Sequence, residues 1–387
     1  MRVLIAGGGT GGHIYPALAV ATSLRRRDSA PEIAWIGGRR GLEDRLVPEA
    51  GYRLDRLFLR SLRSVARDVH LVLDPIRLAL SVPQALVILA RRRPAAIFTT
   101  GGYVAIPVLV AARLLRIPVV LWEGNVIPGR SVRATARLAS VVAVSFAPTC
   151  AALAARRCYV TGTPIRDVGA VDRLAARDRL GLRPDDRLML IFGGSQAVQR
   201  FARAIDEALP RLVETCRVLQ VTGDAGYAEA LVARQRLPEA LRDRYRPEPF
   251  LREGMLDALA AADLVVGRAG SSTLAEVAAF GLPLVVVPYP HAGGHQRANA
   301  EAMVAAGAAR LVDDEDFDAA ALLDAAALLG DPQAHLGMAA AARALGRPGA
   351  ADAVAELVIA LATRSPLPSA AAIARRSTAT AGAGSVG

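Results

Sequence analysis

The sequence is poor in aromatic side chains and in cysteine, and it contains no long apolar run. Aromatic residues make up 4% of the chain and hydrophobic residues 53%, so the cores must be rich in Ala, Leu and Val. Because no stretch of about 18 uninterrupted apolar residues occurs, we expect no helix that spans a bilayer. Because the sequence begins with a strand-like apolar run, we expect no signal peptide. Cys150, Cys158 and Cys216 have no metal-type spacing and cannot all pair, so a reducing cytosol is the simplest account.

The chain carries a strong positive charge, because 47 Lys and Arg residues outnumber 36 Asp and Glu residues and leave a net charge of +11. The cations are overwhelmingly arginine. This charge favours an anionic partner, whether a nucleic acid, a phosphorylated substrate or an anionic membrane. A general bias toward Arg and Ala explains the charge equally well. The length of 387 residues predicts two or three domains.

A glycine-rich turn near the start is the most informative motif. Residues 7–16 follow an apolar run and precede a helical pattern, which predicts a strand, a glycine turn and a helix. The N–H groups of such a turn suit an anion. The spacing fits the dinucleotide fingerprint, but no acid is placed for a ribose after the second expected strand, so an oxidoreductase is disfavoured. His13 lies where the turn becomes helix, either as a base or as a residue that only packs or caps.

Apolar runs alternate with helical patterns throughout the first half. Strands that are apolar throughout predict a parallel sheet covered on both faces, with ligands beyond the carboxyl ends of the strands. Tyr103, Glu123 and Asn125 lie at two of these ends. Strands are expected at residues 3–6, 33–36, 96–99, 119–122 and 141–144, with helices between them, for example at 16–26 and 104–115.

The second half repeats this layout after a polar break that follows residues 161–166. An apolar run leads into a second glycine turn with Ser195. We therefore expect two α/β domains, residues 1–163 and 164–345, that face each other across a cleft. A helix near 350–362 is expected to return to the first domain, and residues 364–387 to form a disordered tail. Strands of the second half are expected at 188–192, 217–221, 264–266 and 284–287.

The helix start after residue 270 carries the densest polar chemistry of the second half. Ser272 and Thr273 offer hydroxyl and N–H groups to a phosphate, and Glu276, one turn later, suits the two hydroxyls of a ribose. The same residues could instead cap their own helix. Gln296 and Asn299 lie three residues apart at another expected helix start, where amides suit sugar hydroxyls or a polar surface.

The segment 60–93 combines apolar side chains, among them Leu71, Ile76 and Leu80, with arginines that include Arg77. An apolar face bordered by cations fits contact with an anionic membrane surface. A crossover helix packed on the sheet, with a solvated arginine face, explains the same pattern without a membrane.

The motifs together closely resemble the MurG family, the peripheral-membrane N-acetylglucosaminyltransferases of peptidoglycan synthesis. The resemblance implies a GT-B fold of two Rossmann-like domains. It also implies that UDP-N-acetylglucosamine (UDP-GlcNAc), bound mainly by the C-terminal half, donates its sugar to lipid I, the undecaprenyl-diphosphoryl-N-acetylmuramoyl-pentapeptide, and gives lipid II and UDP. The matching runs, in the family's order, are Gly9-Thr10-Gly11-Gly12-His13-x-x-Pro16, Gly101-Gly102-Tyr103, Glu123-x-Asn125, Gly193-Gly194-Ser195-Gln196, Arg268-x-Gly270-x-x-Thr273-x-x-Glu276 and His295-Gln296-x-x-Asn299-Ala300.

The family's residue roles carry over to the matching positions. The resemblance implies an inverting reaction in which His13 deprotonates the C4 hydroxyl of the acceptor, with Tyr103, Glu123 and Asn125 on the acceptor side. Arg268 would flank the uracil. The implied UDP-GlcNAc-binding residues are Thr10, Gly11, Gly12, Asn125, Arg166, Ser195, Arg268, Ser272, Thr273, Glu276, Gln296 and Asn299.

The resemblance further implies a peripheral enzyme on the cytoplasmic face of the cell membrane, with Leu71, Ile76, Arg77 and Leu80 as the docking patch. The expected partners are UDP-GlcNAc, lipid I, an anionic membrane surface and the cell-wall synthesis machinery, but no nucleic acid. No cofactor and no obligatory metal are expected, because no Asp-x-Asp pattern lies at a strand end of the first half and residues 313–316 resemble a solvated loop.

The chain departs from the family pattern at several places. Trp122 and Gly124 stand where the family usually has His and Gln, and Thr163 where it has Asn. Residues 197–198 differ after the second glycine turn, and residues 293–294 are Gly-Gly where an acid is common. Two alternatives therefore stay open: another GT-B enzyme with a different nucleotide sugar, and a non-catalytic membrane-surface protein that keeps the nucleotide-sugar site for scaffolding.

Overall fold

The computed structural model describes residues 1–39, 41–60, 70–193, 198–251 and 254–380. The chain divides into two compact units. The first comprises Met1–Asp167 together with Arg347–Gly387, and the second comprises Val168–Gly346. Each unit is an α/β layer structure built on its own parallel sheet, as the apolar runs predict.

The sheet of the first unit has the strand order β3-β2-β1-β4-β5-β6-β7, and all its pairings are parallel. The five strands expected from the apolar runs are all present. The two edge strands, β3 and β7, were not anticipated. The bounds are β1 Arg2–Ala6, β2 Glu32–Arg39, β3 Arg53–Arg60, β4 Ala96–Thr99, β5 Val119–Glu123, β6 Val141–Val144 and β7 Cys158–Val160.

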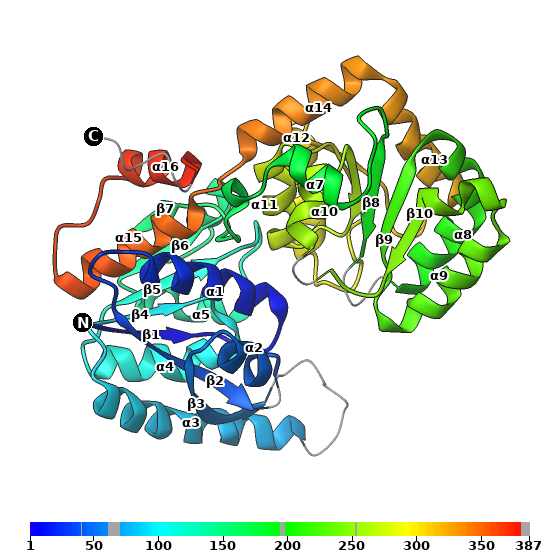
Figure 1. Cartoon of the computed structure of the whole chain (residues 1–387). Coiled ribbons are helices and arrows are strands. Elements are labelled where there is room, and N and C mark those ends of the chain that lie inside the picture. Colours follow the sequence, from blue (N-terminus) through cyan, green and yellow to red (C-terminus); the bar gives the residue numbers. More distant parts are fainter. Residues whose placement is uncertain (40, 61–69, 194–197, 252–253, 381–387) are drawn as a thin grey trace. The chain divides into compact units, whose positions relative to one another are not determined.

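Helices cover both faces of this sheet (Figure 1). Val3 and Ile5 of β1 share a core with α1 and α15, whereas Leu4 and Ala6, on the opposite face, share a core with α3 and α4. The late helix α15 lies beside α1 and so completes the first unit (Figure 1). The helices are α1 Gly11–Arg25, α2 Glu43–Glu49, α3 His70–Arg92, α4 Gly102–Leu114, α5 Arg130–Thr135, α6 Ala147–Ala151, α15 Ala350–Thr363 and α16 Ala370–Thr378.

The presence of α16 corrects the expected disordered tail, which is wrong for residues 370–378. Ser369 caps this helix, because its hydroxyl accepts a hydrogen bond from the Ala372 N–H at 3.2 Å. Ile373 is fully buried, and α16 packs against α15 and β7. A cap and a buried apolar anchor thus stabilise a helix within a low-complexity stretch. Residues 381–387 of the expected tail lie outside the described residues.

The cysteines also differ from expectation. Cys150, in α6, and Cys158, at the start of β7, form a disulfide, so the assumption of reduced cysteines is wrong for this pair. Their Cα atoms are 5.8 Å apart, a separation that suits a disulfide. Cys216 is a buried free thiol. Burial raises the pKa of the Cys216 thiol to about 11, so it stays protonated and unreactive at neutral pH.

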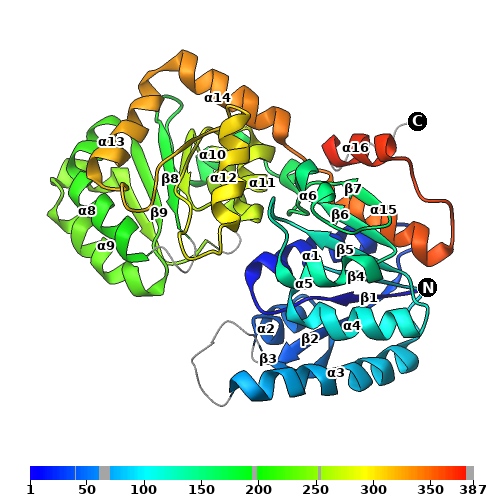
Figure 2. The same cartoon turned by 180° about the vertical axis from the view of Figure 1, so that it is seen from behind.

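The second unit has the strand order β10-β9-β8-β11-β12-β13, again parallel throughout. The neighbouring strands β8 and β9 and the adjacent helices α8 and α9 can be followed in Figure 2. The edge strands β10 and β13 were not anticipated. The strands are β8 Leu188–Phe192, β9 Arg217–Val221, β10 Tyr245–Glu248, β11 Leu264–Gly267, β12 Leu284–Val286 and β13 Ala309–Leu311. The helices are α7 Arg173–Arg179, α8 Val198–Thr215, α9 Asp224–Arg236, α10 Met255–Ala261, α11 Ser271–Phe280, α12 His295–Ala305, α13 Ala319–Ala327 and α14 Pro332–Leu345.

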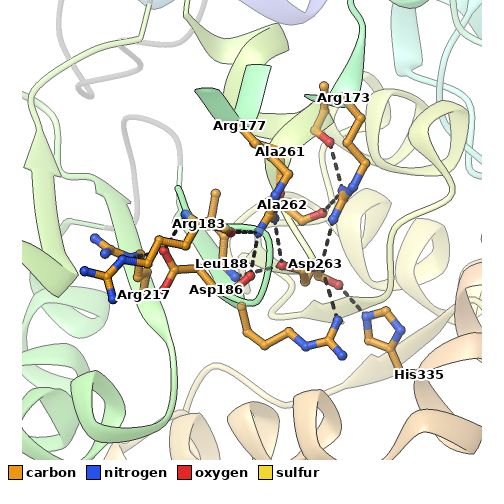
Figure 3. Close-up of polar contacts among 12 residues, drawn as sticks. Arg173, Arg177, Arg183, Asp186, Leu188, Arg217, Ala261, Ala262, Asp263 and His335 are labelled. Atoms are coloured by element: carbon orange, nitrogen blue, oxygen red, sulfur yellow. Dashed lines mark hydrogen bonds and ion pairs between the residues drawn. The ribbon is translucent and has the colours of Figure 1, made fainter. Parts of the chain in front are cut away.

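A buried ion-pair cluster marks the amino end of the second sheet (Figure 3). Asp263, 5% exposed, precedes β11, and its carboxylate accepts from the Leu188 N–H at 2.8 Å. Arg173 donates to this carboxylate at 2.7 Å and Arg177 at 3.4 Å, and both also donate to carbonyls at the C-terminal end of α10. The His335 ring nitrogen bonds the Asp263 carbonyl at 2.8 Å. Asp263 therefore fastens α7 and α14 to the two central strands β8 and β11.

Candidate active site

A pocket of about 550 Å³ lies in the first unit, where the chain leaves β1 and β4. It brings together three residues expected at the site, Thr10, His13 and Tyr103. Gly11 and Gly12 follow Thr10 in the first turn of α1. The pocket also has lining residues from α4 and α5 that the sequence did not point to, namely Ile106, Arg130, Ser131 and Ala134.

The ring of His13 has a defined proton arrangement. Its Nδ1 lies 2.8 Å from the carbonyl oxygen of Thr100, and a carbonyl can only accept a hydrogen bond. Nδ1 therefore carries the hydrogen, and in the neutral ring Nε2 is the nitrogen that accepts a proton. The residue beside Nε2 is Gly102, whose φ of 77° favours glycine, so no side chain covers this side of the ring from that position. The neutral ring of His13 therefore carries its hydrogen on Nδ1 and has Nε2 as its acceptor nitrogen.

Glu123 does not line the pocket but holds the loop that leads into α5, one of the pocket walls. It is 4% exposed, and its Oε1 accepts from both the N–H and the side-chain amide of Asn125 at 2.9 Å. Its Oε2 accepts from the Gly129 N–H at 2.8 Å. The Thr149 hydroxyl donates to the Asn125 carbonyl at 2.9 Å. Because Gly129 directly precedes Arg130, this carboxylate sets the position of one pocket wall.

Arg268 follows β11 in the second unit and is 7% exposed. Its guanidinium carbon lies 4.9 Å from the ring centroid of Phe201 and 5.4 Å from that of Tyr289. It donates to the Val287 carbonyl at 3.1 Å and pairs with Asp314 at 2.5 Å. Arg268 therefore joins the loops that follow β11, β12 and β13.

Asp314 of the acidic loop 313–316 is part of this network, so the expectation of a solvated loop is wrong for this residue. Asp314 pairs with Arg200 at 3.2 Å as well as with Arg268, and its side chain is only 17% exposed. Asp313 pairs with Arg297 of α12. The loop follows β13 at the same edge of the sheet, where its carboxylates meet arginines from three other segments.

The start of α11 has the features that a phosphate site requires. Its N-cap is Gly270, which has no side chain that could cap the helix, so a Ser or Thr does not occupy the N-cap position as the capping alternative requires. The hydroxyl of Ser272 is buried and has no hydrogen-bond partner among the described residues. Thr273 and Glu276 continue the same helix and are half-buried.

The two amides of α12 hold neighbouring loops. The Gln296 side-chain oxygen accepts from the Tyr289 N–H at 2.9 Å. Asn299 is fully buried, and its side-chain amide donates to the Ala269 carbonyl at 3.2 Å. Since Ala269 follows Arg268, Asn299 fixes the loop that leads into α11.

The remaining expected residues are placed as follows. Arg166 is half-buried near the end of the first unit, and Ser195 lies outside the described residues. In the parts of the chain that the structure describes, no three His, Cys, Asp or Glu side chains are grouped so that they could hold a metal ion.

The architecture defines the class of protein: two units, each built on a Rossmann-like parallel sheet, are characteristic of the GT-B fold, which the structural neighbours of this chain share. Residues 3–144 match the glycosyltransferase family 28 N-terminal domain, and residues 188–356 match the glycosyltransferase family 28 C-terminal domain. The chain therefore belongs to glycosyltransferase family 28.

Similar proteins cover nearly the whole chain. A relative from Moorella thermoacetica, named UDP-N-acetylglucosamine–N-acetylmuramyl-(pentapeptide) pyrophosphoryl-undecaprenol N-acetylglucosamine transferase, is 40% identical over 370 residues, which are 93% of this chain and 98% of that protein. The crystal structure of Acinetobacter baumannii MurG is 29% identical with a TM-score of 0.73, covering 92% of this chain and 99% of that one. A putative UDP-N-acetylglucosamine 2-epimerase from Listeria monocytogenes, 14% identical with a TM-score of 0.67 over 95% and 98% of the two chains, shares the fold.

Proposed function

We propose that this chain transfers N-acetylglucosamine from UDP-GlcNAc to the C4 hydroxyl of the N-acetylmuramoyl-pentapeptide of lipid I, giving lipid II and UDP for peptidoglycan synthesis. The observation that carries the proposal is the pocket of the first unit, where His13 has the tautomer of a base beside Tyr103. Relatives about 40% identical over nearly their full length bear the name of this activity, which supports the same assignment.

The acceptor binds in the first-unit pocket. His13 Nε2 takes the proton of the C4 hydroxyl as that oxygen attacks the anomeric carbon of the donor. The bond from the anomeric carbon to the diphosphate breaks on the opposite face, and UDP leaves with the electron pair, so the configuration inverts. Tyr103 and Thr10 line the space around the hydroxyl, whereas Glu123 and Asn125 hold the wall that carries Arg130.

The donor binds mainly in the second unit. The uncapped start of α11, with Ser272 and Thr273, together with Arg166 and Ser195, holds the diphosphate and stabilises the charge of the leaving group. Glu276 accepts hydrogen bonds from the ribose. Gln296, at the start of α12, reads the sugar.

Two residues of the second unit that were expected to touch the donor are assigned a supporting role instead. Arg268 and Asn299 are buried, and both are engaged with the chain around the loop after β11. Arg268 and Asn299 position the loop that leads into α11. Their replacement would therefore weaken donor binding indirectly, by displacing Ser272 and Thr273.

The first experiment measures transfer of labelled N-acetylglucosamine from UDP-GlcNAc to a lipid I analogue in the presence of a chelator. We expect lipid II analogue to form with the chelator present, because arginine and N–H donors replace a metal at the diphosphate. Release of UDP without a glycosylated lipid would support UDP-GlcNAc as the donor but contradict lipid I as the acceptor. It would point to a GT-B enzyme with another acceptor. If the protein does not bind UDP-GlcNAc at all, the proposed reaction is wrong.

We also propose that the enzyme works as a peripheral protein at the cytoplasmic face of the membrane, beside the cell-wall synthesis machinery, through the outer face of α3. Ile76 and Leu80, four residues apart, are 50% and 58% exposed, and Val87 lies on the same face. The inner face, with Ala85 and Leu89, is buried against the sheet. No helix within the described ranges is long and apolar enough to cross a membrane.

Replacing Ile76 and Leu80 together by serine is expected to weaken binding to anionic vesicles by more than tenfold. Burial of one such side chain contributes about 1.5–3 kcal/mol, of which an interface captures a part. Vesicle flotation at fixed ionic strength measures the fraction of protein bound to the vesicles. The matched control is Leu336→Ser in the second unit, 66% exposed, which should bind as the wild type. Equal loss in both variants, or in neither, would contradict docking through α3. Leu71 is left unchanged because its side chain lies outside the described residues.

A further inference from the structure

A fully buried carboxylate, Glu43, lies behind the pocket of the first unit and has no role in the reaction derived above. It is the first residue of α2. Its Oε2 accepts from the Gly9 N–H at 2.7 Å, and its Oε1 accepts from the Gly38 N–H at 3.0 Å and from the Tyr103 hydroxyl at 3.2 Å. One side chain thus joins the first glycine turn, the end of β2 and the start of α4.

The surrounding glycines show that the chain is shaped around this carboxylate. A Cβ at Gly8 would lie 2.3 Å from Glu43 Oε1, and one at Gly41 would lie 2.0 Å from Oε2. A Cβ at Gly37 would lie 2.9 Å from Glu43 Cγ. Because real Cβ contacts are not this short, only glycine at these positions admits the carboxylate.

The position of Glu43 also decides what the first glycine turn does. A carboxylate already accepts the hydrogen of the Gly9 N–H, which a phosphate would otherwise use. The Gly9 N–H is therefore part of a fixed wall of the pocket and is not available to a phosphate.

Glu43 is connected to His13 through both walls of the pocket. The glycine turn bonded to Glu43 leads directly into His13. On the other side, the Thr100 carbonyl orients the His13 ring, and Tyr103, three residues later, donates to Glu43. Burial, and after it the charge of Glu43, raises the pKa of the Tyr103 hydroxyl, so Tyr103 stays a hydrogen-bond donor.

We propose that Glu43 is a positioning residue for transfer: its carboxyl group clamps the first glycine turn to Tyr103 and thereby fixes His13 relative to the acceptor hydroxyl. The inference rests on the proposed placement of the acceptor in the first-unit pocket. A glutamine cannot replace it, because its NH₂ group would face one of the three donors that the carboxylate now accepts from.

Glu43→Gln is expected to lower kcat for transfer to the lipid I analogue by 10- to 100-fold, while KM for UDP-GlcNAc changes less than twofold because the donor binds in the other unit. Tyr103→Phe removes one of the three donors and should lower kcat by less. The double variant should be no worse than Glu43→Gln alone, since both changes break the same bond. The matched control is Glu49→Gln on the same helix, whose side chain is 54% exposed and which should leave all constants unchanged.

A purely structural role of Glu43 predicts another pattern. In that case Glu43→Gln would lower kcat, raise KM for UDP-GlcNAc and lower the stability of the protein together. Normal kcat in a folded Glu43→Gln enzyme, or an equal loss of donor affinity, would overturn the proposal. Folding is followed by tryptophan fluorescence, because Trp35 donates to the Gly7 carbonyl at 2.9 Å and so reports on the turn.

Amide hydrogen exchange tests the role of Glu43 independently of the proposed reaction, because it requires no substrate. In Glu43→Gln, amides of residues 7–13 and 36–41 should exchange at least tenfold faster, whatever the acceptor is. If the wild type shows no transfer to lipid I but the exchange rises, the reaction is wrong and the clamp stands. Unchanged exchange in both segments would overturn the clamp, even with an active wild type.

Discussion

His13→Ala is expected to lower kcat for transfer by about 10²–10⁴, the usual contribution of a positioned general base. The physical reason is the fixed tautomer, in which the Thr100 carbonyl holds the Nδ1 hydrogen and Nε2 accepts the proton of the acceptor hydroxyl. KM for UDP-GlcNAc should stay within a few fold, because most of the proposed donor contacts belong to the second unit. Steady-state transfer with each substrate varied in turn measures both quantities.

His13→Asn separates the base from simple positioning. Its side-chain amide can still donate to the Thr100 carbonyl, as Nδ1 does, but it has no nitrogen that takes up a proton. If His13 is the base, the asparagine enzyme should be as slow as the alanine enzyme, and the acid limb of the pH–rate profile should disappear in both. Near-normal turnover of His13→Asn would leave His13 only the role of placing the acceptor.

The sequence predicted the central strands of both sheets and missed the four edge strands. Central strands of a covered parallel sheet are apolar throughout, as in residues 188–192, and this pattern is visible in the sequence. The edge strand β3 carries Arg53, Asp55 and Arg56 among its apolar residues, and β10 contains Pro247. An edge strand meets solvent along one side, so its sequence resembles that of a loop.

The candidate site was predicted by residue type but only partly by role. The starts of α1, α11 and α12 were placed correctly after strands, whereas the second glycine turn lies largely outside the described residues. Whether a polar side chain touches a ligand or supports a loop depends on burial, which neighbours from distant segments decide. Asn299 and Arg268 were expected to contact the donor, yet each is enclosed by loops that follow other strands. The sequence alone cannot reveal that enclosure.

Glu43 is the clearest residue that the sequence analysis missed. It belongs to no motif, and only three nearby glycines, at 37, 38 and 41, could have drawn attention to it. Several glycines around one acid suggest a chain that makes room for a carboxylate. Tyr103, whose hydroxyl donates to Glu43, lies 60 residues away in the sequence. This contact could not be inferred from the local sequence pattern.

Asp263→Ala is expected to lower the free energy of unfolding of the second unit by about 3–5 kcal/mol, because it leaves the buried Arg177 guanidinium without its carboxylate. It also removes the acceptor of the Leu188 N–H at the start of β8. Both tryptophans, Trp35 and Trp122, lie in the core of the first unit. Far-UV circular dichroism should therefore show an earlier transition in urea, while the tryptophan signal keeps its midpoint if the units unfold independently.

The size of this loss distinguishes a buried cluster from a surface ion pair. Asp243→Ala is the control in the same unit, since Asp243 pairs with Arg234 while its side chain is 90% exposed, and such pairs contribute about 0–1 kcal/mol. Asp263→Asn should fall between the two, because its carbonyl oxygen can still accept from Leu188 or Arg173 but the charge opposite Arg177 is lost. If Asp263→Ala were as stable as Asp243→Ala, the arginines of α7 would be satisfied by the α10 carbonyls alone. The carboxylate would then add nothing to the attachment of α7, and the cluster in Figure 3 would be a consequence of the fold instead of one of its causes.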